Sequence, residues 1–284
     1  MSQTAERPET PAADPDREFG VALARAFGGA IIFGLPLLMT MEMWTLGATM
    51  SPMRLALFAL LWLPLLVGLS AVAGFERTLR LKHDALDAFV AIFVGITAAV
   101  VFLSLLGVLQ EAATARERVG MIVLQALPGS MGALLAVSQL GTSEEREEEQ
   151  EKRQDTWGGE LLLMAVGALF LAFNIAPTEE ITLLALKMTP THSAVAILVS
   201  LGLMHAFVYA VEFSGQAAIP PGTPFASVFL RYTVVGYAIV LVICAYTLWT
   251  FGRLDGLAAA EVLSLVIALG LPGAVGAAAA RLLL

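Results

Sequence analysis

The sequence predicts an all-α membrane protein with eight transmembrane helices, arranged as two parallel four-helix repeats (4+4). Three observations support this fold class. First, 58% of the 284 residues are hydrophobic and only 14% are charged, whereas soluble domains carry roughly 45–50% apolar and about 25% charged residues. Second, eight apolar runs are long enough to cross a bilayer. Third, two motifs each occur twice, in the same order.

The eight apolar runs each approach the length of about 20 helical residues that spans a hydrocarbon core of about 30 Å. Helices are expected because the backbone of an open sheet cannot satisfy its hydrogen bonds in lipid. The hydrophobicity is continuous rather than alternating, which excludes a membrane barrel. The predicted helices cover residues 24–47, 54–75, 86–109, 118–140, 159–186, 192–213, 225–251 and 257–280.

The first repeated motif lies near the end of the first predicted helix of each half. Thr40-Met41-Glu42 aligns with Thr178-Glu179-Glu180, which lies 138 positions later. The same offset also aligns Leu46 with Leu184, Met50 with Met188 and Pro52 with Pro190. A match of this kind predicts an internal repeat, and a repeat sets the architecture of the whole chain.

The second repeated motif lies in the last predicted helix of each half. The sequence Leu-Pro-Gly at residues 127–129 recurs at residues 271–273, and Glu117 aligns with Glu261. Each half contains four predicted helices, so both halves enter the membrane from the same side. The repeats are therefore expected to be parallel, unlike the inverted repeats of many transporters.

The polar segments divide the chain into four predicted parts. Residues 1–20 are expected to form a disordered cytoplasmic tail, because they are rich in polar residues and lack the pattern of a signal peptide. Residues 21–140 form the first repeat and residues 159–284 the second. Between them, residues 141–158 form a charged cytoplasmic linker, which is read as a solvated connection or as an acidic docking segment.

Lysine and arginine predict the orientation, because cytoplasmic segments carry an excess of both. If the N-terminus is inside, the outer segments hold Arg54, Arg116, Arg118, Lys187 and Arg253. The cytoplasmic segments then hold Arg7, Arg17, Arg25, Arg77, Arg80, Lys82, Arg146, Lys152, Arg153, Arg231 and Arg281. The sequence thus predicts a multi-pass protein of the bacterial inner membrane with both termini in the cytoplasm.

Glu42 and Glu180 are the central candidate site residues, because ionisable groups in apolar surroundings are expensive and mark functional sites. Glu42 lies ten residues before Pro52, or roughly 15 Å deep if its helix is continuous. Two carboxylates facing each other at this depth would share a proton or bind a cation. They are therefore also the candidate metal ligands. Structural hydrogen bonding is the alternative role.

Neighbouring residues extend this candidate pathway. Thr40 and Thr178 precede the two glutamates and offer hydroxyl oxygens, and Glu179 adds a carboxylate with no match in the first half. Pro36 and Pro177 interrupt the helices just before the glutamates and free backbone carbonyls. Asn174 aligns with Pro36, so the predicted breaks are similar but not identical.

A second polar stripe lies in the sixth predicted helix. His205, Tyr209 and Glu212 follow the i, i+4, i+7 spacing of one helix face. Such a face would relay protons or line a cavity. The alternative is a structural role, in which His205 bonds a neighbouring helix and Glu212 pairs with Arg231.

The sequence contains none of the usual enzyme motifs, such as H-E-x-x-H, G-x-S-x-G or Walker A. It is therefore not expected to be an enzyme or to hold a cofactor. No basic patch is present to neutralise phosphates, so a nucleic-acid partner is not expected. Cys244 is the only cysteine, which leaves no disulfide framework.

Residues 33–44, which read FGLPLLMTMEMW, carry a family resemblance together with Pro177-Thr178-Glu179-Glu180. The sequence resembles a family of bacterial integral membrane proteins of unknown function. The resemblance covers most of residues 20–280 and implies a membrane protein without implying an activity.

The function favoured by these features is a cation channel or secondary transporter, for Ca²⁺ or H⁺, with Glu42 and Glu180 lining the pathway. The expected partners are the lipid bilayer and an inorganic cation, and a homo-oligomer is left open. The alternative function is a non-transporting scaffold or sensor that acts through the charged cytoplasmic linker.

Overall fold

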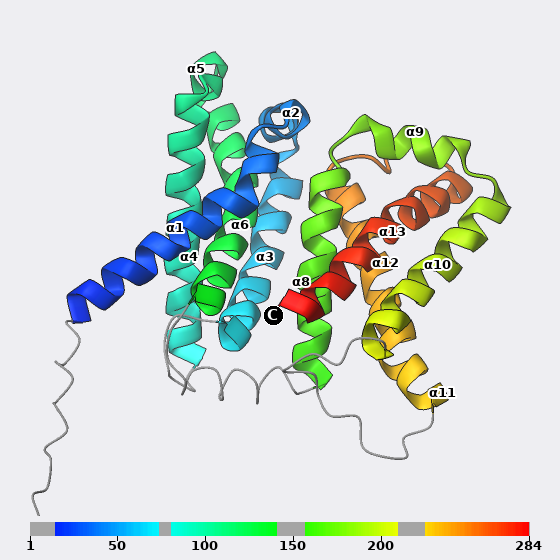
Figure 1. Cartoon of the computed structure of the whole chain (residues 1–284). Helices are drawn as coiled ribbons and strands as arrows, with labels where there is room; N and C mark the ends of the chain where they lie inside the picture. The colour runs from blue at the N-terminus through cyan, green and yellow to red at the C-terminus, as the bar shows by residue number, and fades with distance from the viewer. Residues whose placement is uncertain (1–14, 74–80, 141–156, 210–224, 284) are drawn as a thin grey trace, which may run out of the picture.

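The computed structural model describes residues 15–73, 81–140, 157–209 and 225–283, and the regular elements in these ranges are all helical. Figure 1 shows them as two groups of helices side by side, one from each half of the chain. The described residues contain eight segments that are long and apolar enough to cross a membrane. The predicted all-α fold class and the eight spans are therefore confirmed.

The described residues of the first half form six helices, and the longest of them, α6, lies at the centre of this half. The helices are α1 (Pro15–Leu38), α2 (Met41–Thr49), α3 (Pro52–Ala73), α4 (Leu81–Leu105), α5 (Val108–Glu111) and α6 (Ala115–Leu140). α6 packs against α1, α2, α3 and α4. It is the most buried of the apolar segments in this half, because four helices surround it.

The second half has the same arrangement around its last helix. Its elements are α8 (Trp157–Ile175), α9 (Glu179–Lys187), α10 (Pro190–Tyr209), α11 (Phe225–Val228), the π-helix η1 (Phe229–Val234), α12 (Val235–Thr250) and α13 (Ala259–Leu283). α13 packs against α8, α9, α10 and α12. These pairs correspond to those that α6 makes with α1, α2, α3 and α4.

Matching glycines bring the backbones together at equivalent places. A Cβ atom on Gly29 of α1 would overlap the carbonyl oxygen of Gly132 on α6, and one on Gly167 of α8 would overlap that of Gly276 on α13. Glycine is required at these crossings because the main chains leave no room for a side chain. The recurrence is what a tandem repeat predicts, and the 4+4 repeat itself stays a prediction.

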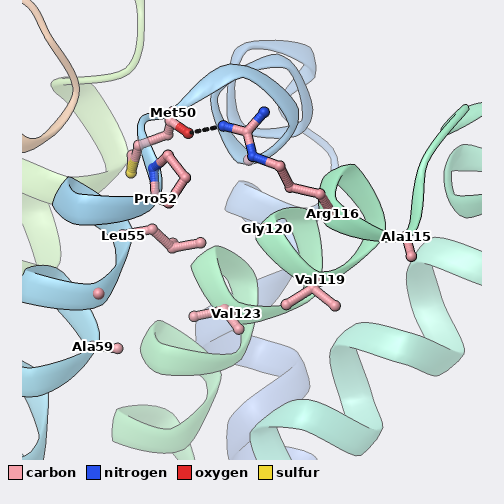
Figure 2. A pocket seen from close by; sticks show the side chains of 11 residues that line it. Met50, Pro52, Leu55, Ala59, Ala115, Arg116, Val119, Gly120 and Val123 are labelled. Carbon is pink, nitrogen blue, oxygen red and sulfur yellow. Dashed lines mark hydrogen bonds between the residues drawn. The ribbon is translucent and has the colours of Figure 1, made fainter.

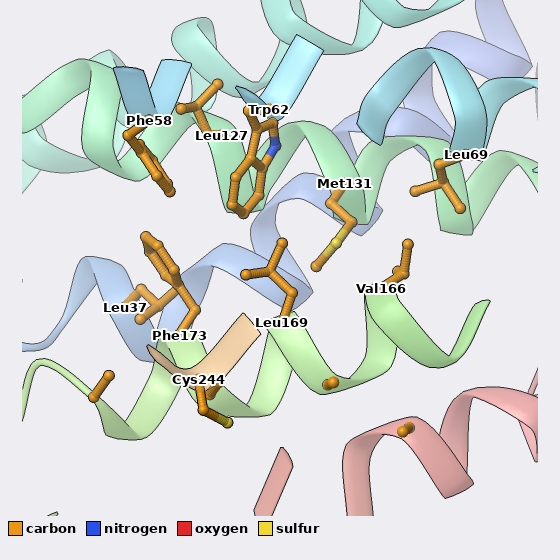
Figure 3. Packing of buried hydrophobic residues seen from close by; sticks show 14 of the residues in the cluster. Leu37, Phe58, Trp62, Leu69, Leu127, Met131, Val166, Leu169, Phe173 and Cys244 are labelled. Carbon is orange, nitrogen blue, oxygen red and sulfur yellow. The ribbon is translucent and has the colours of Figure 1, made fainter. Parts of the chain in front are cut away.

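The two halves meet through α3, which packs against α8 and α12. Phe173 of α8 lies at the centre of an aromatic cluster there, stacked on Phe58 at a centroid distance of 5.3 Å. Trp62 and Phe251 each make an edge-to-face contact with the ring of Phe173, at centroid distances of 5.6 and 4.9 Å. Figure 3 shows Phe58, Trp62 and Phe173 among the buried apolar side chains between the halves. Aromatic pairs of this kind stabilise the contact beyond their buried area.

Two of the predicted spans are broken, and this corrects the sequence prediction. The run 24–47 is not one helix, because α1 ends at Leu38 and α2 begins at Met41. The run 159–186 is likewise divided between α8 and α9. In the second half Pro177 lies in the break and restricts the residue before it. In the first half Pro36 lies inside α1 without ending it.

The boundaries of the polar segments are tested only in part. α1 begins at Pro15, inside residues 1–20, which the sequence predicts to be disordered. Residues 15–20 are helical in the structure, as the first turns of α1. The rest of that tail, and the linker up to residue 156, lie outside the described residues.

Candidate functional site

Glu42 lies in the first turn of the short helix α2. Thr40 is the N-cap residue of this helix, with an extended backbone at φ −98° and ψ 114°. Glu42 is half-buried, and within the described part of the chain its carboxylate makes no hydrogen bond and no ion pair. A carboxylate in the first turn of a helix is favoured by the exposed N–H groups there.

Glu180 has the matching position in α9. Thr178 is the N-cap residue, with φ −74° and ψ 154°, and both Glu179 and Glu180 lie in the first turn. Both carboxylates are exposed, and neither makes a hydrogen bond or an ion pair to any described residue. The motif that occurs twice in the sequence is thus a helix restart that occurs twice in the structure.

The depth predicted for the glutamates does not apply, because it assumed a continuous helix. Figure 1 shows α2 and α9 at the same end of the molecule, beyond the long helices α1 and α8. α2 packs on α6 and α9 packs on α13, so each glutamate lies over its own half. No hydrogen bond joins Glu42 to Glu180, and the described residues contain no group of three or more His, Cys, Asp or Glu suited to a metal ion.

The two N-cap threonines close the ends of the preceding helices. The Thr40 hydroxyl donates to the carbonyl of Pro36 at 2.5 Å, and the Thr178 hydroxyl donates to that of Ile175 at 2.8 Å. The side-chain amide of Asn174 donates to the carbonyl of Phe170 at 2.7 Å. Thr40 therefore satisfies a carbonyl at the end of α1, where backbone carbonyls lack intrahelical partners. Thr178 and Asn174 add hydrogen bonds to carbonyls in the last turns of α8.

Distant side chains complete the end of α1. Gln125 of α6 donates to the carbonyl of Leu37 at 3.0 Å, and the indole of Trp44 donates to that of Leu38 at 2.7 Å. Gln125 is buried. The sequence analysis missed it, and the only available signal was a polar residue within an otherwise apolar predicted helix.

Three arginines at this end of the molecule are held by backbone carbonyls. We call this end, formed by α2, α9 and the connections 112–114 and 251–258, the α2–α9 face. Arg116 donates to the carbonyl of Met50 at 3.0 Å, Arg118 to that of Ala112 at 3.2 Å, and Arg253 to that of Pro177. Arginine bound in this way neutralises the partial negative charge of carbonyls at helix ends.

A cavity of about 470 Å³ lies beside α2, between the start of α3 and α6. Figure 2 shows Leu55, Val119 and Val123 in its wall and the guanidinium of Arg116 bound to Met50 at its edge. Its lining is apolar apart from this positive charge, which does not suit a cation. Glu42 and Glu180 do not line it.

Two groups of glutamates on the α2–α9 face differ in their partners. Glu117 accepts a hydrogen bond from the backbone N–H of Ala113 at 2.9 Å, and Glu261 accepts one from that of Ala258 at 2.8 Å. Both lie in first turns, of α6 and α13, and so cap these helices as the repeat predicted. Glu42, Glu179 and Glu180 form the second group, which has no such partner among the described residues.

One ion pair on this face joins the two halves. The guanidinium of Arg54 on α3 makes two hydrogen bonds to the carboxylate of Asp255, at 2.8 and 2.7 Å. It also lies 5.2 Å from the ring centroid of Trp249. The hydrogen bonds from Arg54 lower the pKa of the Asp255 carboxyl from its ordinary value. The sequence offered no signal for this pair, because its members lie 201 residues apart.

Of the three side chains in the second predicted stripe, only that of His205 lies among the described residues. The Nδ1 atom of His205 on α10 lies 2.9 Å from the hydroxyl of Thr233 in η1, and its ring lies edge-on to Phe229 at 5.1 Å. His205 thus bonds a neighbouring helix, which was the structural alternative. A π-helix is rare and often marks a functional site. The side chain of Tyr209 and all of Glu212 lie outside the described residues.

Three buried carboxylates were missed by the sequence analysis. Asp84 and Asp87 of α4 and Glu160 of α8 are 7%, 5% and 5% exposed. They lie near the starts of their helices, at the opposite end from the α2–α9 face. The Ser70 hydroxyl donates to Asp87 at 3.5 Å.

Comparisons with known proteins agree with this membrane architecture. Residues 22–284 match the profile of a family described as "Putative integral membrane protein (DUF2391)". The chain belongs to this family. Membership confirms the resemblance seen at residues 33–44 and 177–180, and it identifies an integral membrane protein with several transmembrane helices. A search of curated proteins and a search of solved structures each found no match.

Proposed function

We propose that this member of the DUF2391 family is a cation channel or secondary transporter, with Glu42 and Glu180 binding the cation as it enters. We place the protein in the bacterial inner membrane with both termini in the cytoplasm, so that the α2–α9 face lies outside. Ca²⁺ and H⁺ are the proposed cations, because carboxylate oxygens are hard ligands for Ca²⁺ and accept protons.

The observation that supports this proposal is the contrast between charges on the α2–α9 face. The guanidinium groups of Arg116, Arg118 and Arg253 are engaged by carbonyls. The carboxylates of Glu42 and Glu180 have no partner among the described residues. Lys187 of α9 also has no partner among the described residues, but the three unpartnered glutamates Glu42, Glu179 and Glu180 outnumber it. Such an excess of free negative charge attracts cations and raises their local concentration.

Flux measurements in proteoliposomes test the proposal. The purified protein is reconstituted, and Ca²⁺, H⁺, Na⁺ and K⁺ fluxes are measured for the wild type and for Glu42→Gln, Glu180→Gln and the double variant. Each single variant should lower the flux severalfold, and the double variant should lower it further, because each glutamate lies over its own half. Melting temperatures should stay close to the wild type.

Glu117→Gln and Glu261→Gln are the matched controls. These glutamates lie on the same face but bind backbone N–H groups, so their variants should keep the flux and lose some stability instead. Wild-type flux in the Glu42/Glu180 double variant would remove these residues from the mechanism. If the wild-type protein conducts none of the four cations, the transport proposal itself is overturned.

A further inference from the structure

A long apolar groove lies between the two halves, at the end where the chain begins and ends. Its volume is about 870 Å³, within the range of about 300–1,000 Å³ that is typical of ligand pockets. α1 and α6 form one wall, and α8 and α13 form the other. The residues at the crossings are small: Gly28, Gly29, Ala136, Gly167, Gly276 and Ala280 all line it.

The groove has one charged residue and one closed end. Arg25 of α1 lines it, is half-buried, and makes no hydrogen bond or ion pair to the described residues. At the other end Phe33 of α1 and Phe170 of α8, which also line the groove, meet edge to face at a centroid distance of 5.0 Å. The groove therefore extends from the Arg25 guanidinium to the paired rings of Phe33 and Phe170.

The position of Arg25 along α1 puts its charge within reach of the membrane surface. Arg25 lies six residues inside the apolar segment Phe19–Leu38, toward the side of the chain termini. A long basic side chain at such a place reaches toward the interface, where phosphate groups are found. Phe33 lies on the other side of the middle of this segment, roughly 12 Å from Arg25 along the helix.

We propose that this groove binds an anionic phospholipid of the leaflet on the side of the chain termini. The acyl chain occupies the apolar space between α1 and α8, and the phosphate accepts hydrogen bonds from the Arg25 guanidinium. Charge complementarity identifies the occupant: an apolar partner alone would leave Arg25 without an anion, whereas basic residues between transmembrane helices bind acidic headgroups. The proposal does not depend on the proposed transport function.

Lipid binding is tested by native mass spectrometry of the delipidated full chain. The protein is titrated with phosphatidylglycerol or with phosphatidylcholine of the same acyl composition. The wild type should bind one phosphatidylglycerol per chain, about tenfold more tightly than phosphatidylcholine, which corresponds to about 1.4 kcal/mol. Both lipids carry a phosphate, but the choline cation of phosphatidylcholine offsets the attraction between that phosphate and Arg25.

Two variants separate the two parts of the site. Gly28→Leu places a side chain in the groove, where a Cβ atom meets no protein atom within 4 Å, and it should abolish binding of both lipids. Gly20→Leu is its control, because Gly20 lies on the same helix, is equally unobstructed and does not line the groove.

Arg25→Gln should remove only the preference for the anionic lipid. Arg17→Gln, at an exposed position of α1 outside the groove, is its control.

Two results would overturn the proposal. Wild-type lipid binding in both Gly28→Leu and Arg25→Gln, with unchanged melting temperatures, would exclude the groove. A wild-type protein that binds no lipid and has the mass of a dimer would assign the groove to a second copy instead. If Gly28→Leu does not fold, Ala24→Leu fills the same groove from an exposed position and takes its place.

Discussion

At the scale of single residues, identical residue types have different roles because their surroundings differ. Glu117 and Glu261 are engaged in capping their own helices, while Glu42 and Glu180, in equally early turns, have no such partner among the described residues. The same applies to arginine: Arg116 binds a carbonyl, Arg54 binds a carboxylate, and Arg25 faces an apolar groove.

The Arg54–Asp255 pair leads to a prediction about pH. Its carboxylate is 57% exposed, so the pair is expected to stabilise the fold by only about 0–1 kcal/mol. Because the pKa of folded Asp255 is lowered, this contribution is complete above the ordinary pKa of the carboxyl. It is lost as the pH falls through the lower folded value.

Melting curves of wild type and Asp255→Asn in detergent, measured from neutral to acid pH, check this expectation. The two melting temperatures should differ slightly near neutral pH and converge in acid, and salt should reduce the difference. A difference that grows as the pH falls would contradict the assigned direction.

At the scale of elements, the decisive feature is that two apolar runs are divided into a long and a short helix. The break after α1 is stabilised by Thr40, Trp44 and Gln125, which donate to its last carbonyls. The break after α8 is stabilised by Thr178 and by Arg253, which donates to Pro177. Different side chains thus satisfy backbone carbonyls at the equivalent break of the two halves.

The helix crossings give a prediction at this scale. Gly167→Ala should lower the melting temperature, because its Cβ atom would overlap the carbonyl oxygen of Gly276 and overpacking typically costs about 1–3 kcal/mol. Gly202→Ala on α10 is the control, since Gly202 is exposed and a Cβ atom placed there would meet no other atom within 4 Å. Equal melting temperatures for the two variants would show that α8 and α13 separate without cost.

At the scale of the whole molecule, the eight apolar segments of the described residues predict that both ends of the chain lie on one side of the membrane. Single cysteines test this topology in a Cys244→Ala background, which removes the only native thiol. Ala113→Cys is exposed on the α2–α9 face and should react with a membrane-impermeant maleimide in intact cells. Ser143→Cys, in the linker that the sequence assigns to the cytoplasm, should react only after lysis. The opposite pattern would invert the proposed orientation.

The sequence by itself determined the class of the protein, its eight spans and the positions of its two repeated motifs. Crossing a bilayer depends on local runs of about 20 apolar residues, and such runs are visible without knowledge of the fold. The sequence also indicated that Glu117 and Glu261 begin helices, because helix starts have local signals.

The sequence indicated an interruption just before each glutamate, but only the tertiary structure decided where α1 ends and what surrounds Glu42 and Glu180. The break after α1 depends on Gln125, which lies 88 residues from the carbonyl it binds. The pairing of Arg54 with Asp255 and the groove beside Arg25 depend on contacts between the two halves. A hydrogen bond or a cavity forms where side chains meet in space, and periodicity along the chain carries no information about such distant encounters.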